Sequence, residues 1–136
     1  MTHLQPPPEP ELDAGERALL ARGAELFSRR HFYEAHDALE ELWSGVRGPS
    51  RDFFQGLVQA AVAFYHLGNG NLEGARRLCE RALGRLERYP PRYAGVDAGP
   101  LRASLGRLRD SLAAGENPPE GEPPALTLSL SPRGDA

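Results

Sequence analysis

The side chains best suited to chemistry lie close together in the stretch from residue 32 to residue 71. His36 and Glu40 are four residues apart, so on a helix they share one face. A histidine beside a carboxylate can act as a general base. Gln55 and Gln59 repeat the spacing on the next segment, where their amides can orient water or a substrate. These four side chains form a candidate catalytic cluster, with His36 and Glu40 as its reactive pair.

An antiparallel hairpin of the two segments would place Glu40 level with Gln55, and His36 level with Gln59. His66 would then lie roughly 10 Å further along the axis, at about 1.5 Å per residue. A metal ion holds imidazole nitrogens at about 2 Å, so His36 and His66 are not expected to share one. A single-ion site on His36 and Glu40 is also possible, but two protein ligands are too few for a usual zinc site, so we predict no metal site and no cofactor.

A structural interpretation of the cluster stays open beside the functional one. The same four side chains could form a closed hydrogen-bonded network that fixes the register of two core helices. Gly56 and Ala63 are small and flank the glutamines, which leaves room for a ligand or for a close helix. If the cluster is a binding groove, the residues expected to line it are Tyr33, Trp43, Gln55, Gln59 and His66.

The basic residues, all arginine, are unevenly distributed in a chain of formal net charge −3. Four of them recur at helical spacing and predict one exposed ridge: Arg77, Arg81, Arg85 and Arg88. Glu73 stands four residues before Arg77 and should pair with part of that charge. Exposed aromatic residues do not interleave with the arginines, so phosphate or nucleic-acid binding is the less favoured alternative.

Apolar periodicity predicts five helices, at about residues 12–29, 32–46, 51–67, 72–89 and 100–113. Ser50 and Asn71 are expected to cap the third and fourth. The third is apolar around most of its circumference and should be central. The predicted fold is an all-α bundle of antiparallel helical hairpins. It is faintly tetratricopeptide-like, because three alanines have the spacing of that repeat's small residues: Ala63, Ala75 and Ala82.

Composition divides the chain into a flexible Pro-rich arm at residues 1–11, a helical domain at 12–115, and a Pro-rich tail at 116–136. Leucines alternate within the tail, at positions 126, 128 and 130, as in an extended segment lying on the domain, although we predict no sheet. Cys79 falls on a buried stripe and is expected to be an inert thiol. The chain has neither a leader nor an apolar run of membrane length, which predicts a cytoplasmic location.

Three motifs resemble the bacterial and archaeal family known as domain of unknown function 309, over about residues 14–90. They are HDALEELW, FFQGLVQAAVAFYH and GNLEGARRL. The resemblance implies a small all-helical bundle. It also implies that the family's characteristic positions are His36, Glu40, Trp43, Gln55, Gly56, Gln59 and His66. It implies no activity, because the family has none assigned.

Together these observations favour a binding or interaction domain with a polar groove between the second and third helices. Its partner would be a small molecule or a protein, and a second copy of the chain could close an open apolar groove to form a homodimer. No membrane partner is expected. Two alternatives remain: a hydrolase-like or metal-dependent enzyme that uses His36 and Glu40, and nucleic-acid binding through the arginine ridge.

Overall fold

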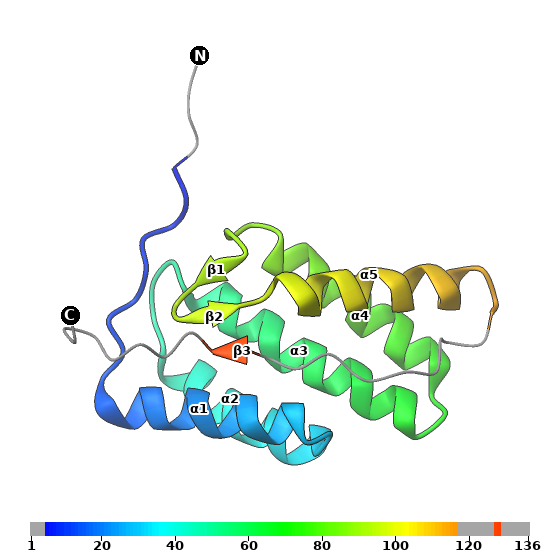
Figure 1. The fold of residues 1–136 in the computed structure, drawn as a ribbon, viewed down its shortest axis with the longest axis horizontal. Helices are drawn as coiled ribbons and strands as arrows, with labels where there is room; N and C mark the ends of the chain where they lie inside the picture. Colours follow the sequence, from blue (N-terminus) through cyan, green and yellow to red (C-terminus); the bar gives the residue numbers. More distant parts are fainter. Residues whose placement is uncertain (1–4, 117–126, 129–136) are drawn as a thin grey trace.

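The computed structural model describes residues 5–116 and 127–128, and in this part the chain is a small helical bundle with one short sheet (Figure 1). The helices are α1 (Ala14–Ser28), α2 (Phe32–Gly45), α3 (Arg51–Gly68), α4 (Leu72–Leu86) and α5 (Gly99–Ala113). The predicted all-α fold class is confirmed, and every helix end lies within three residues of its predicted position. Apolar periodicity was sufficient to locate them because each helix buries one face.

Helix α3 is the centre of the bundle. It packs against α2 on one side and α4 on the other, while α1 covers α2 and α5 covers α4. Figure 1 shows this order, with α1 and α2 on one side of α3 and α5 on the opposite side. Nine α3 residues are buried, including Phe53, Phe54 and Phe64. The polar residues of α3 are therefore confined to a narrow stripe between its two neighbours. None of the helices in the described residues has the length and apolar composition needed to cross a membrane.

Local side-chain bonds define several helix ends. The Asp13 carboxylate accepts a hydrogen bond from the Glu16 amide, and the Glu16 carboxylate accepts one from the Asp13 amide, which forms a capping box at α1. The Asn71 side chain accepts from the amide of Gly74, so its predicted role as the cap of α4 is confirmed. Ser50 is the N-cap residue of α3, as predicted, but its side chain makes no capping hydrogen bond.

The prediction that the chain has no sheet is wrong. Strands β1 (Arg92–Tyr93), β2 (Val96–Asp97) and β3 (Thr127–Leu128) pair antiparallel in the order β1-β2-β3. The turn between β1 and β2 has positive φ at both central residues, Ala94 (56°) and Gly95 (79°). This geometry matches the twist of a two-residue hairpin. Part of the tail is thus extended at residues 127 and 128, while Leu126 and Leu130 lie outside the described residues.

The hairpin also holds the N-terminal segment. The Tyr93 hydroxyl donates to the carbonyl of Pro8 at 2.6 Å, and the Ala94 amide donates to the Glu9 carboxylate at 2.9 Å. Tyr93 itself is buried against Phe53. The arm predicted over residues 1–11 is therefore fastened to the domain at Pro8 and Glu9.

Candidate functional site

His36 lies on α2 between two carboxylates of the same helix. Its Nε2 is 3.5 Å from Oε1 of Glu40, and its Nδ1 is 3.4 Å from Oδ1 of Asp37. The His36 side chain is 21% exposed, whereas those of Asp37 and Glu40 are 59% and 51% exposed. The opposite face of α2 is buried through Ala35, Ala38, Leu39 and Leu42. The packed helix thus presents an imidazole and two exposed carboxylates at its accessible side.

A row of aromatic rings connects this cluster with the end of α3. The ring centroids of Tyr33 and His36 are 5.9 Å apart, those of Tyr33 and Tyr65 are 5.5 Å apart, and those of Tyr65 and His66 are 6.1 Å apart. Tyr33 and Tyr65 are 52% and 38% exposed. His66 Nδ1 lies 3.4 Å from the side-chain amide nitrogen of Asn71, next to the turn that ends α3. The four rings form an accessible surface built from α2 and α3, which we call the aromatic face.

Trp43 is partly buried and packs against the core one helical turn from Glu40. The Arg51 guanidinium lies over its indole ring, 4.3 Å from the centroid, and donates hydrogen bonds to the carbonyls of Trp43 and Val46. Arg51 therefore provides hydrogen-bond donors to carbonyl groups at the C-terminal end of α2. The indole Nε1 is buried and, within the part of the chain described, has no hydrogen-bond partner.

The hydrogen bond of Gln59 differs from the expected network with α2. The Gln59 side-chain oxygen accepts a hydrogen bond of 3.1 Å from Nε of Arg85 on α4, in place of the expected bond to His36. Gln55 is half-buried on the same stripe of α3. The hydrogen-bonding of Gln59 therefore connects α3 to α4, while the carboxylates beside the His36 ring belong to α2.

Two ring contacts report the register of the α2–α3 hairpin. The ring centroids of Tyr33 and Tyr65 are 5.5 Å apart, and those of Phe32 and Phe64 are 5.4 Å apart. The midpoints of these pairs are positions 49 and 48, close to the predicted centre near positions 47 and 48. Register alone therefore does not account for the bond that Gln59 makes to α4.

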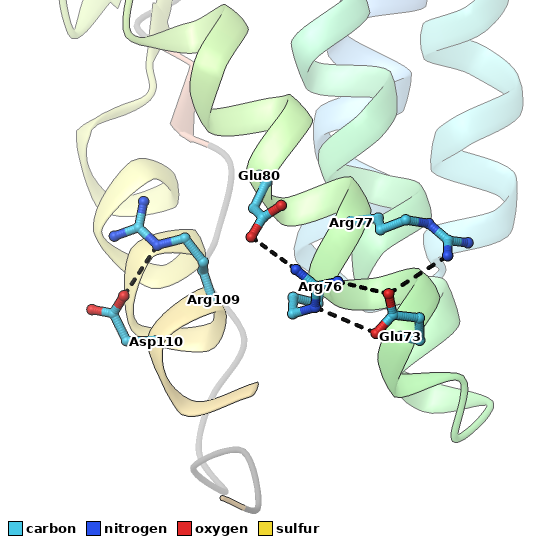
Figure 2. A network of polar contacts seen from close by, with 6 residues as sticks. All are labelled: Glu73, Arg76, Arg77, Glu80, Arg109 and Asp110. Carbon is cyan, nitrogen blue, oxygen red and sulfur yellow. Dashed lines mark hydrogen bonds and ion pairs between the residues drawn. The ribbon is translucent and has the colours of Figure 1, made fainter. Parts of the chain in front are cut away.

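Three of the four arginines of the predicted ridge lie beside carboxylates, and the fourth, Arg81, is exposed. Asp52 of α3 pairs with two of them: its Oδ1 lies 2.8 Å from Nη1 of Arg85, and its Oδ2 lies 2.5 Å from Nη1 of Arg88. Figure 2 shows Arg77 reaching Glu73, 3.7 Å away, one helical turn earlier on α4. Arg85 is only half-exposed, so the ridge predicted from the spacing is interrupted at its third member.

Figure 2 also shows Arg76, which the helical spacing of the ridge did not include. Its guanidinium lies between two carboxylates of α4, 2.6 Å from Glu73 and 3.1 Å from Glu80. The hydrogen bond from Arg76 lowers the pKa of the Glu73 carboxyl. These intrahelical pairs further reduce the positive potential of α4.

The space beside the glutamine stripe is filled by a neighbouring helix. A Cβ atom added to Gly56 would lie 2.9 Å from Cδ2 and 3.0 Å from Cγ of Leu86, and 3.3 Å from Cβ of Arg85. Ala63 is fully buried. The sequence allowed these small residues to leave room either for a ligand or for a close helix. At Gly56 the room is taken by helix α4.

Cys79 lies on the buried face of α4 with no exposed surface. Burial raises the pKa of its thiol to about 12. A thiol in this environment stays protonated and is a poor nucleophile at neutral pH.

Sequence reasoning missed Asp37 and Tyr65. Asp37 directly follows His36, whereas the four-residue spacing pointed only to Glu40. On a helical wheel Asp37 lies about 100° from His36, close enough for its carboxylate to reach the imidazole. Tyr65 could have been found by asking which α3 residue lies opposite Tyr33, but the answer depends on where the hairpin is centred.

Comparisons with known proteins agree with the motifs. Residues 20–78 match the family model described as "Domain of unknown function (DUF309)". An "Uncharacterized protein" of Aquifex aeolicus (strain VF5) is 29% identical over 106 residues, which cover 77% of this chain and 32% of that protein. The "Uncharacterized protein YpuF" of Bacillus subtilis (strain 168) is 35% identical over 60 residues, 43% of this chain and 34% of that protein. The chain thus spans about a third of the length of the curated relatives it matches. The resemblance predicted from the motifs is confirmed over residues 20–78, which match the domain of unknown function DUF309 and contain the candidate residues of α2 and α3.

Proposed function

We propose that the chain is a protein-binding domain and that its contact surface is the aromatic face formed by α2 and α3. The observation that carries this proposal is the contact between Tyr33 and Tyr65, two exposed tyrosines from different helices. Tyrosine provides a large contact area with few rotatable bonds and a hydroxyl at its tip, and it is enriched where proteins bind each other. Burial in the core does not account for either ring.

The charge around the tyrosines favours a basic partner. Helix α2 contains four carboxylates and no arginine, and two of the carboxylates, Asp37 and Glu40, lie beside His36. An arginine or lysine of a partner could stack on a tyrosine ring and pair with a carboxylate at the same time. We therefore propose that the partner presents basic side chains to this surface.

Binding of nucleic acid is less well supported than binding of a protein. The candidate phosphate ligands are the four arginines of the predicted ridge. Three of them, Arg77, Arg85 and Arg88, lie within 4 Å of a carboxylate, and the fourth, Arg81, is exposed. A phosphate would have to displace Asp52 or Glu73 from these pairs. Two of the arginines, at positions 85 and 88, instead contribute to attaching α4 and the residues after it to α3.

Site-specific photo-crosslinking in the cells that encode the protein tests the proposal. A benzophenone amino acid placed at Tyr33 should yield a discrete covalent adduct with a partner, because benzophenone captures only groups in contact with it. The matched control carries the same amino acid at Arg107, an exposed residue of α5 on the far side of α4. Adding Tyr65→Ala to the protein that carries benzophenone at position 33 should reduce the adduct yield.

The mass of the adduct identifies the type of partner. A larger species containing another protein supports the proposal, and a species of twice the chain's mass identifies a second copy as that partner. An adduct below about one kilodalton would replace the protein partner with a small ligand and overturn the proposal. So would the absence of an adduct at position 33, or the same adducts at positions 33 and 107.

A further inference from the structure

We infer that His36, Asp37 and Glu40 bind one divalent transition-metal cation on the accessible side of α2. The imidazole and the two carboxylates each offer one ligand atom, and these three atoms all lie within 4.8 Å of one another. Within residues 5–116 and 127–128 this is the one group of three histidine, cysteine or acidic side chains with such spacing. The inference does not depend on the proposed protein partner, but both ligands use the carboxylates of Asp37 and Glu40, so a bound cation would compete with basic side chains of the partner.

The distances suit a site that closes around an ion. Zinc and related cations hold imidazole nitrogen and carboxylate oxygen at about 2.0–2.2 Å, so two ligand atoms of one ion lie about 3–4 Å apart. Glu40 lies 3.5 Å from Nε2 of His36, and Asp37 lies 3.4 Å from Nδ1, the other ring nitrogen. One ion takes only one of these nitrogens, and three ligand atoms chosen one per residue lie within 4.8 Å of one another. The remaining adjustment is a rotation of the two carboxylates toward the same nitrogen. Both are more than half exposed and can rotate without disturbing the core.

The helix supplies the scaffold that holds the three ligands together. Positions 36, 37 and 40 fall within an arc of about 100° on a helical wheel, with Glu40 between the other two. The opposite side of α2 is anchored by buried residues such as Leu39 and Leu42, so the backbone that carries the ligands is fixed. A site built on a packed helix loses less conformational entropy on binding than one built on a loop.

The chemistry of the donors favours a particular class of cation. Two carboxylates flanking one imidazole gather negative charge, which a divalent ion neutralises more fully than a single proton on the ring does. Mixed nitrogen and oxygen donors suit Mn²⁺, Co²⁺, Ni²⁺ or Zn²⁺ better than Ca²⁺ or Mg²⁺, which prefer oxygen alone. Three protein ligands leave at least one coordination position for water or for an incoming group.

Calorimetric titration of the untagged protein with Mn²⁺, Co²⁺, Ni²⁺ and Zn²⁺, one at a time, tests the inference. We expect one ion per chain for at least one of the four. Each of His36→Ala, Asp37→Asn and Glu40→Gln should weaken binding by at least about tenfold. The matched control is Glu41→Gln, which removes an exposed carboxylate of the same helix outside the trio and should leave the affinity unchanged. Helicity by circular dichroism verifies that each variant is folded.

Two further outcomes complete the test. Tyr33→Ala should leave the metal affinity unchanged while it abolishes contact with the proposed partner, so the two proposals fail separately. The metal site is overturned if none of the four cations binds the wild-type protein at millimolar concentration. It is equally overturned if the variants of His36, Asp37 and Glu40 bind as tightly as the Glu41→Gln control.

Discussion

Gly56 provides a sharp test of how α3 and α4 pack. Glycine inside a helix costs about 1 kcal/mol relative to alanine, so replacing it should ordinarily stabilise the protein. At position 56, however, the added Cβ would lie 2.9 Å and 3.0 Å from two atoms of Leu86. Leu86 is 1% exposed and cannot swing into solvent. We therefore predict that Gly56→Ala destabilises the protein.

The expected change in unfolding free energy is the difference between two opposing contributions. Forcing an extra methyl group into a packed interface costs about 1–3 kcal/mol, and the gain in helix propensity returns about 1 kcal/mol. The net loss of unfolding free energy should be about 1 kcal/mol, or about 4 °C in Tm for a domain of this size. Gly84 is the matched control, because it lies in α4 with nothing within 4 Å of its Cβ position. Gly84→Ala should raise the unfolding free energy by about 0.5–1 kcal/mol.

Urea unfolding followed by circular dichroism measures these free energies. The decisive comparison repeats Gly56→Ala in a Leu86→Ala background. Leu86→Ala alone should cost about 2–5 kcal/mol, but it removes the atoms that the new methyl group would meet. Gly56→Ala should then become stabilising. If it stabilises the wild-type protein, or destabilises both backgrounds equally, contact with Leu86 is not the reason for glycine at this position.

Two further predictions concern the groups that attach α4 and the thiol buried on it. Asp52→Asn should lower the unfolding free energy by about 1 kcal/mol, less at high salt, because it weakens two partly exposed ion pairs between α3 and α4. Asp110→Asn, which removes an exposed carboxylate, should change it little, and equal losses would refute the prediction. Burial raises the Cys79 pKa from 9.0 to about 12, so the thiol ionises at a lower pH in the unfolded chain than in the folded protein. The wild-type protein should therefore lose stability relative to Cys79→Ala between pH 9 and 12 in pH-dependent urea unfolding, whereas parallel curves would contradict this.

The helices could be predicted from the sequence because each one combines a long apolar stripe with a distinct ending. The segment from Gly68 to Asn71 is an example: Gly70 adopts a positive φ of 76°, and Asn71 caps the next helix. The small sheet could not be predicted in this way. Its strands are two residues long, too short to show alternation, and the turn between them places Ala94 in a conformation that alanine rarely adopts.

The candidate site was predictable only to the level of a helix face. A helical wheel shows that His36 and Glu40 are neighbours, which the 3.5 Å distance between them bears out. It does not show which neighbouring helix a residue of α3 will meet. Gln59 bonds to Arg85 on α4, which approaches α3 closely at Gly56, and the sequence of α3 alone does not show that approach.

The central claim is that the side of α2 carrying His36 serves binding and is not a buried network that holds the fold together. The most direct test is the unfolding free energy of His36→Ala. The carboxylates that His36 contacts belong to its own helix, and alanine is the better helix former, so we predict a loss of less than about 1 kcal/mol. A loss of about 3 kcal/mol or more, as expected when one member of a buried charged network is removed, would contradict the claim.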